Sequence, residues 1–133
     1  MKKLGKVLVA MAMAMTLFGC GGGEQASANK DQFVVGMECS YAPFNWQTSQ
    51  ESDTTVSLGN AGYADGYDVQ IAKRIADDLG KELVIKKISW DGLTVALESG
   101  EIDAIIAGMT ANETREEGID FTTPYYDSEG MIM

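Results

Sequence analysis

Residues 107–115 (AGMTANETR) carry the groups that could bind a carboxylate. Gly108 ends an apolar run, so backbone N–H groups can approach a ligand closely there. Thr110 adds a hydroxyl group, and Arg115 adds a guanidinium that can hold a carboxylate through two parallel hydrogen bonds. The alternative is that Arg115 only pairs with an acidic neighbour, Glu116 or Asp120, on the surface.

A second group of candidates combines a carboxylate with aromatic rings. Glu38 precedes Tyr41, Phe44 and Trp46, and an acid beside aromatic faces suits an amine or another cation. The alternative is that the rings are core and that Glu38 is solvated. Trp90 either forms the wall of a pocket or belongs to the core.

The residues for nucleophilic or metal chemistry are sparse. The chain has no histidine, which excludes a Cys/His metal site or a Cys–His nucleophile. Cys39 could be a reactive thiol, but a small, half-buried residue at a strand end is the better interpretation. Asp68 is interpreted as a helix N-cap and Asp103 as a strand-edge residue, and not as an acid/base pair; Asp91 is interpreted as a cap and not as a catalytic acid. We expect no metal and no cofactor.

The elements that must position these residues alternate between strand and helix. Apolar runs predict strands at 33–37, 82–88 and 102–108, and helical spacing predicts helices at 69–79 and 91–98. The predicted class is therefore α/β, with a mainly parallel sheet flanked by helices and the first strand in the middle. Ligands bind beyond the carboxyl ends of such strands, where the candidates above lie.

Other segments are predicted from composition and periodicity. The polar stretch 47–64 is interpreted as a surface excursion or a small hairpin, and Gly80 as the glycine that ends the first helix. The residues expected in the core are Val34, Val35, Ile75, Leu79, Val84, Leu97, Ile105 and Ile106.

The amino terminus predicts export. Three lysines precede an uncharged apolar stretch, 7–18, which is too short for a membrane span and fits a signal peptide. The sequence LFGC ending at Cys20 resembles the lipobox of bacterial lipoproteins, which implies cleavage after residue 19 and acylation of Cys20. An ordinary secretory signal or an anchor helix is the alternative. The predicted organisation is a signal peptide (1–19), a flexible tether (20–31) and one domain (32–133).

The charge balance restricts the partners. The 133 residues include 10 basic and 20 acidic ones, and cleavage removes three of the lysines. The remaining excess of acids argues against nucleic acid or anionic lipid as a partner, because both need a basic face.

Several segments together resemble one family. They are VGM (35–37), YAPF (41–44), GYDV (66–69), WDGL (90–93), GEIDAIIAGMT (100–110), TR (114–115), IDFT (119–122) and PYY (124–126). In this order and spacing they resemble the bacterial extracellular solute-binding proteins, family 3, of polar amino-acid ABC transporters. The resemblance runs from Phe33 almost to the end and implies the first lobe of a type II periplasmic-binding-protein fold.

The resemblance also implies a ligand site. Arg115 would grip the α-carboxylate, Trp90 would stack on the ligand, and Glu38 would contact the end of its side chain. The implied ligand-binding residues are Glu38, Tyr41, Trp90, Gly108, Met109, Thr110 and Arg115. Ala107 departs from the many relatives that have a hydroxyl donor at this position, which removes one ligand contact.

The function implied is capture of a polar amino acid, with a basic or amide side chain favoured, and its delivery to an ABC permease. We expect a monomeric binding protein, not an enzyme, that is held at the cell envelope outside the cytoplasm by a lipid on Cys20. Because the chain stops where the first lobe finishes, we expect a truncated form without a second lobe, which alone should bind poorly. The alternatives are an extracytoplasmic enzyme such as a cyclohexadienyl-type dehydratase, with Glu38 as its acid or base, and the sensor domain of a receptor.

Overall fold

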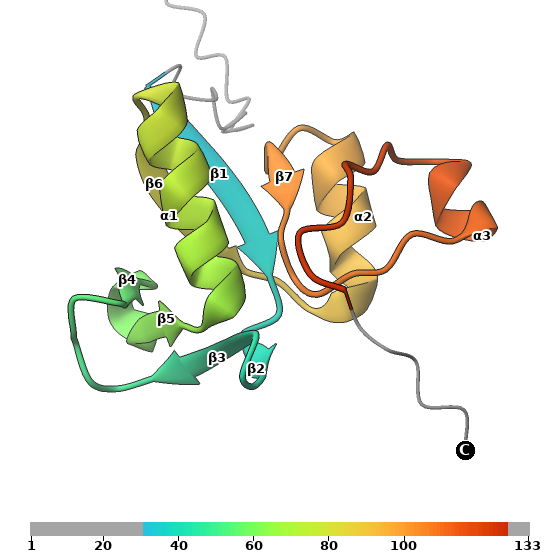
Figure 1. The fold of residues 1–133 in the computed structure, drawn as a ribbon. Coiled ribbons are helices and arrows are strands. Elements are labelled where there is room, and N and C mark those ends of the chain that lie inside the picture. Colours follow the sequence, from blue (N-terminus) through green and yellow to red (C-terminus); the bar gives the residue numbers. More distant parts are fainter. Residues whose placement is uncertain (1–30, 128–133) are drawn as a thin grey trace, which may run out of the picture.

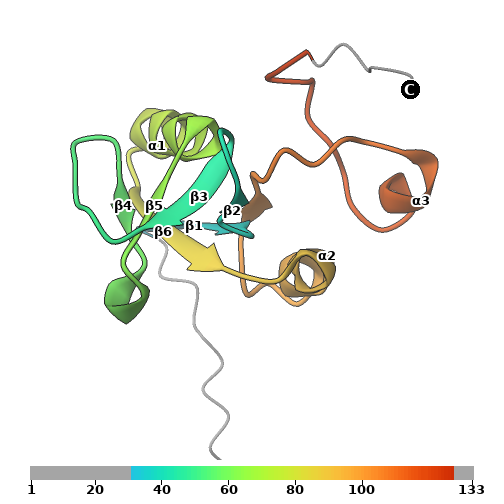
Figure 2. The same cartoon turned by 90° about the horizontal axis from the view of Figure 1, so that it is seen from below.

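A three-stranded parallel sheet forms the centre of the computed structural model, which describes residues 31–127. Its strands are β1 (Gln32–Met37), β6 (Glu82–Lys87) and β7 (Ala104–Ile105), in the order β6-β1-β7. Helix α1 (Tyr67–Leu79) covers one face of the sheet, and α2 (Trp90–Glu98) covers the other (Figures 1 and 2). The predictions of an α/β class, a parallel sheet and a central first strand are confirmed.

A smaller antiparallel sheet follows β1 and leads into α1. It consists of β2 (Ser40–Tyr41), β3 (Asn45–Thr48), β4 (Val56–Ser57) and β5 (Tyr63–Asp65), in the order β2-β3-β5-β4. A short 3₁₀ turn, Gly59–Ala61, connects β4 to β5. The polar stretch 47–64 thus contributes strands to a small sheet, as the hairpin interpretation predicted. This sheet lies at the end of the molecule to which β1 and β6 point (Figure 1).

Strand β7 is much shorter than the predicted strand 102–108, because a side chain replaces part of the ladder. The Asp103 carboxylate accepts a hydrogen bond from the Val34 N–H at 2.8 Å, and the Asp103 N–H donates to the Val34 carbonyl at 2.7 Å. Regular pairing with β1 is then limited to Ala104 and Ile105. Gly108, with φ +63°, turns the chain away from the sheet.

The core lies between the sheet and its two helices. Val35, Met37, Val69, Ala72 and Leu93 have no exposed surface. The small residues on the inner face of α1 allow its backbone to lie close to the sheet.

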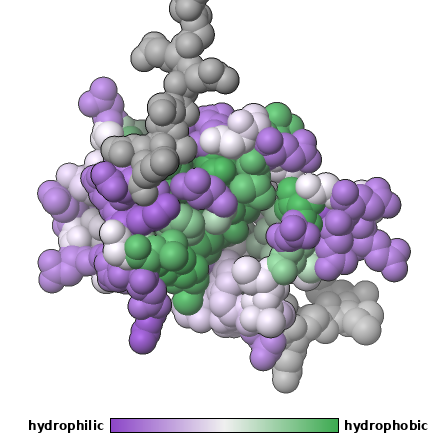
Figure 3. Space-filling model, turned by 90° about the horizontal axis from the view of Figure 1, so that it is seen from above, coloured by the Kyte–Doolittle hydropathy of each residue, from purple (hydrophilic) through white to green (hydrophobic). Residues whose placement is uncertain are grey.

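Two core predictions on α1 are wrong. Ile75 is 37% exposed and Leu79 is 54% exposed, because Val69, Ala72 and Ala76 form the buried face instead. Val35 and Ile106 are buried as predicted, and four of the expected core residues are only partly buried: Val34, Val84, Leu97 and Ile105. Figure 3 views the end of the molecule at which α1 finishes, and apolar side chains are visible there among hydrophilic ones.

Both N-cap predictions are also wrong. Helix α1 begins at Tyr67, and Gly66 occupies the cap position with φ +127°. A side chain at Gly66 would collide with the Phe44 carbonyl oxygen, 2.3 Å from the added Cβ. Asp68 therefore lies inside the first turn. In α2 the cap position is Ser89, and Asp91 lies in the first turn. Gly80 adopts the left-handed conformation at the end of α1, as predicted.

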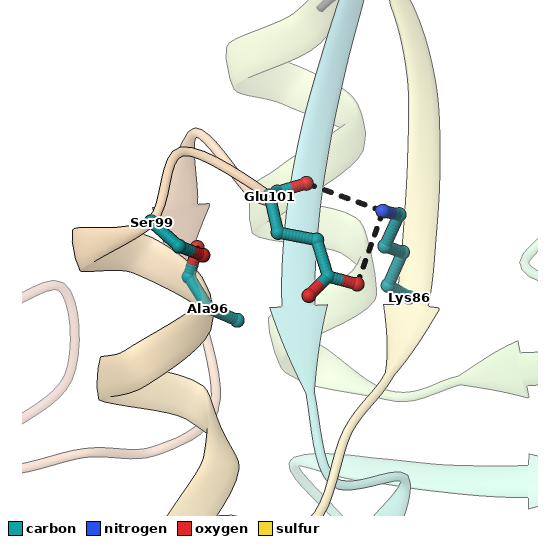
Figure 4. A network of polar contacts seen from close by, with 4 residues as sticks. All are labelled: Lys86, Ala96, Ser99 and Glu101. Atoms are coloured by element: carbon teal, nitrogen blue, oxygen red, sulfur yellow. Dashed lines mark hydrogen bonds and ion pairs between the residues drawn. The ribbon is translucent and has the colours of Figure 1, made fainter. Parts of the chain in front are cut away.

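An ion pair links β6 to the connection that precedes β7. The Lys86 ammonium lies 3.2 Å from the Glu101 carboxylate and 3.3 Å from the Glu101 carbonyl, across the face of β1 (Figure 4). Gly36 is the β1 residue in register with Lys86. A side chain there would meet Ile102 at 2.5 Å, so the close passage of this connection requires the glycine. The charges are partly solvated, so the pair stabilises the fold by about 1 kcal/mol at most.

Within residues 31–127, no helix combines the length and the apolar character needed to cross a membrane. The predicted signal peptide, Cys20 and residues 21–30 of the predicted tether lie outside the described residues.

Candidate ligand-binding site

The structure brings three of the predicted site residues together. The Arg115 guanidinium lies 5.4 Å from the centre of the Trp90 ring, at cation–π distance. One of its nitrogens donates to the Thr110 carbonyl at 2.7 Å. These residues come from the start of α2 and from the segment after β7, so the contact joins two strand-to-helix connections.

A local turn directs Arg115 back towards the strand ends. Arg115 belongs to α3 (Glu113–Glu116), a single turn whose N-cap residue is Asn112. The Asn112 side chain accepts a hydrogen bond from the Arg115 N–H at 3.0 Å. In the described part of the chain, no carboxylate forms an ion pair with Arg115, so the alternative of a surface pair is not what the structure shows. Among residues 31–127, only one of the five N–H groups of this partly buried guanidinium is used, so these residues leave the others available for an anion.

Gly108 and Tyr41 also meet. A Cβ atom at Gly108 would lie 3.1 Å from the Tyr41 ring, so the ring rests directly on the glycine. Tyr41 in turn stacks on Phe44, with ring centroids 5.2 Å apart. Tyr41, the last residue of β2, therefore lies beside the backbone of residues 107–115, the predicted carboxylate-binding segment.

A cavity of about 630 Å³ opens beside these residues. Four predicted site residues line it, together with residues 119–127: Tyr41, Gly108, Met109 and Thr110. Its volume is in the range of small-molecule sites. The charged residues in its lining are all acidic, namely Asp103, Asp120 and Asp127. A cavity of this composition favours a cationic or amine-bearing group.

Trp90, Arg115 and Glu38 do not line this cavity. Trp90 and Arg115 form their own contact, described above. Glu38 is half-buried and follows β1 directly, and the chain turns at Cys39, whose φ is +56°. The described residues give the Glu38 carboxylate no side-chain hydrogen bond, so its predicted role stays a prediction.

A buried polar network was missed in the sequence. Asp68 has no exposed surface; its carboxylate accepts hydrogen bonds from the Asn45 amide at 2.7 Å and from the Tyr125 hydroxyl at 2.8 Å. The Asn45 side-chain oxygen accepts from the Cys39 N–H at 2.8 Å. One signal in the sequence could have predicted the burial of Asp68. Asp68 lies four residues before Ala72, and residues at this spacing share one face of a helix, here the face towards the sheet.

The ionisation of two groups follows from burial. Burial raises the pKa of the Cys39 thiol to about 11, with a smaller opposing effect of Lys87. The thiol is 3% exposed and neutral at physiological pH, which fits the structural interpretation of Cys39. Burial and the bond to Asp68 raise the pKa of the Tyr125 hydroxyl, which is therefore a hydrogen-bond donor to the carboxylate. No group of three potential metal ligands occurs among residues 31–127.

Comparison with solved structures gives geometric parallels. Domain 1 of TmArgBP in its arginine-bound form is 35% identical, with a TM-score of 0.63, over 75% of this chain and 71% of that one. An ancestral cyclohexadienyl dehydratase is 25% identical, with a TM-score of 0.60, over 72% of this chain and 35% of that one.

Comparison with known sequences agrees with these parallels. The arginine-binding extracellular protein ArtP of Bacillus subtilis is 31% identical over 134 residues, which cover all of this chain and 48% of the relative. The L-cystine-binding protein TcyJ of Escherichia coli is 31% identical over 92% of this chain and 42% of its own. The chain thus spans about half the length of these relatives. Residues 33–133 match the family model of the bacterial extracellular solute-binding proteins, family 3. The chain belongs to this family.

Proposed function

We propose that the chain captures a polar amino acid outside the cytoplasm and delivers it to an ABC permease, with arginine or another basic amino acid as the preferred ligand. The observation that carries this proposal is the grouping of Arg115, Trp90 and Thr110 at the carboxyl ends of the parallel strands. The named relatives that bind arginine and cystine support it.

In the proposed mechanism, Arg115 binds the α-carboxylate through its free N–H groups. The bond to the Thr110 carbonyl and the contact with the Trp90 ring hold the guanidinium in one orientation before the ligand arrives. A group that is already oriented loses less conformational entropy on binding. Backbone N–H groups of Met109 and Thr110 complete the carboxylate site in this proposal.

The side chain of the ligand is assigned to the acidic and aromatic cavity beside Tyr41. Asp103, Asp120 and Asp127 supply negative charge, and none of the described lysines or arginines lines the cavity. This arrangement supports a basic side chain over an acidic one. Glu38 is assigned to the end of the ligand side chain, as the family resemblance implies.

The test is a thermal-shift panel of the twenty amino acids on the chain that follows Cys20. Arginine at 100 times its dissociation constant would stabilise the folded state by about 2.7 kcal/mol. Domain 1 of TmArgBP was solved by itself in an arginine-bound form, which supports ligand binding by a chain that comprises a single lobe. The expectation from the sequence was the opposite, namely that this chain alone binds poorly. A panel in which no amino acid raises the melting temperature contradicts the proposed function for this chain.

We assign the protein to the outer face of the cytoplasmic membrane as a monomer anchored through acylated Cys20. Mass spectrometry of the protein from cells would detect the acyl chains on an N-terminal Cys20. A membrane-bound protein that keeps residues 1–19 and carries no acyl chain contradicts the lipid anchor and favours an uncleaved helix.

The dehydratase is the second candidate, because one solved relative is an ancestral cyclohexadienyl dehydratase. That chemistry needs a placed acid or base, and Glu38 is the candidate. We expect no turnover of a cyclohexadienyl substrate by this chain. Turnover that Glu38→Gln abolishes would establish the enzyme, whereas a binding protein would change only its affinity.

A further inference from the structure

Tyr125 connects three segments that surround the candidate site. Its hydroxyl donates to the Asp68 carboxylate at 2.8 Å and accepts from the Gly108 N–H at 3.2 Å. The second oxygen of Asp68 accepts from Asn45, and Asn45 accepts from the Cys39 N–H. The chain of bonds therefore runs from the turn after β1, through the first turn of α1, to the segment after β7.

Tyr125 itself is held at both ends. Its carbonyl accepts a hydrogen bond from the Tyr67 hydroxyl at 3.1 Å, and the two rings stack with centroids 6.2 Å apart. Tyr67 and Asp68 are neighbours at the start of α1. The position of the Tyr125 hydroxyl is thus determined by a helix that also packs on the central sheet.

Gly108 needs such a contact. It has φ +63° and is exposed, and it follows the last paired residues of β7. Among the residues that the structure describes, the Tyr125 hydroxyl is the acceptor for the Gly108 N–H. This bond restrains the Gly108 peptide, which leads directly into the backbone of Met109 and Thr110.

We infer that Tyr125 is a positioning residue for ligand binding: its hydroxyl, anchored on Asp68, fixes the Gly108 peptide and so orients the backbone of Met109 and Thr110. The inference rests on the proposed function, which assigns this backbone to the ligand carboxylate. Tyr125 does not replace Arg115; it keeps the neighbouring N–H groups directed at the same ligand oxygens.

The test compares Tyr125→Phe with a matched control, Tyr63→Phe. Both variants remove a tyrosine hydroxyl that donates to a carboxylate, but the partner of Tyr63 is Glu51, on the exposed side of the small sheet. The probe is L-arginine, and the readout is its dissociation constant by titration calorimetry. One lost hydrogen bond changes an equilibrium roughly 2- to 12-fold, so we expect about fivefold weaker binding for Tyr125→Phe and no change for the control.

Two outcomes overturn the inference. Unchanged affinity in Tyr125→Phe, with a lowered melting temperature, makes the hydroxyl purely structural. Tighter binding means that the hydroxyl competes with the ligand for the Gly108 N–H. If Tyr125→Phe does not fold, Tyr67→Phe provides the second variant. It removes only the bond to the Tyr125 carbonyl, and we expect roughly a twofold loss of affinity for L-arginine. Unchanged affinity in that variant overturns the inference equally.

A second readout separates this inference from the proposed function. If the unchanged chain does not bind L-arginine, the proposed ligand is wrong, and the orientation of Gly108 is then tested without ligand. Hydrogen exchange at the Gly108 amide reports the loss of its acceptor. We expect exchange about tenfold faster in Tyr125→Phe than in Tyr63→Phe. Equal rates in the two variants overturn the inference.

Discussion

Replacing Asn45 by alanine removes the central member of the buried network. Asn45 has no exposed surface and makes two hydrogen bonds, one from the Cys39 N–H at 2.8 Å and one to the Asp68 carboxylate at 2.7 Å. A buried N–H left without a partner costs about 1–3 kcal/mol, and a bond to a charged group contributes about 1.5–3 kcal/mol. We therefore expect Asn45→Ala to lower the free energy of unfolding by about 3–5 kcal/mol, a large share of the 5–15 kcal/mol typical of a domain.

The assay is urea unfolding followed by tryptophan fluorescence, which the two tryptophans of the chain permit. With a slope of about 1–1.5 kcal/mol per molar urea, the midpoint should fall by roughly 2–5 M. The matched control is Asn60→Ala, the same change at an exposed position, for which we expect a change within about 0.5 kcal/mol. A loss below about 1 kcal/mol for Asn45→Ala would refute the reasoning, because the bonds would then contribute no more than exposed ones.

Three further predictions address the site, the core and the thiol. Arg115→Lys keeps the charge but loses the planar fork and the ring contact, so its affinity for L-arginine should fall roughly 10- to 100-fold in calorimetry at nearly unchanged stability; a smaller loss would mean that charge alone suffices. Gly36→Ala places a Cβ 2.5 Å from Ile102 and should cost about 1–3 kcal/mol in urea unfolding, whereas no cost would show that the contact relaxes freely. Because burial raises the pKa of Cys39 from 9.0 to about 11, its thiolate fraction at pH 8 is about 100-fold below that of the unfolded chain. Iodoacetamide should therefore modify it far faster in urea than in buffer, and equal rates would contradict its burial; the same raised pKa makes the free energy of unfolding fall as the pH rises from 9 towards 11.

The main features of the fold could be predicted from residue patterns because they depend on local periodicity and on general rules of connection. Alternating apolar runs and helical spacing identified β1, β6, α1 and α2. The preference for right-handed crossovers then placed β1 between its neighbours. In the same way, the end of α1 was predicted from Gly80, because a left-handed residue is required there.

The candidate site was only partly predictable. The position of Trp90, Thr110 and Arg115 after predicted strands indicated that they would meet, since parallel strands end at one edge of a sheet. Glu38 follows a strand in the same way, yet it does not line the cavity beside Tyr41; the chain bends at the next residue, Cys39, whose φ is +56°. A positive φ at a non-glycine residue has no clear signal in the sequence.

Residue patterns therefore identify the order of strands and helices, the family and the residue types available at the strand ends. The tertiary structure alone decided how α1 is rotated on the sheet, which exposes Ile75 and Leu79 and buries Asp68. Helical spacing put Val69, Ala72 and Ala76 on one stripe with Ile75 and Leu79, and it did not decide how the helix is turned about its axis. Partners distant in the chain contribute to this choice: Asn45 and Tyr125 satisfy the Asp68 carboxylate, and their hydrogen bonds offset the cost of burying it.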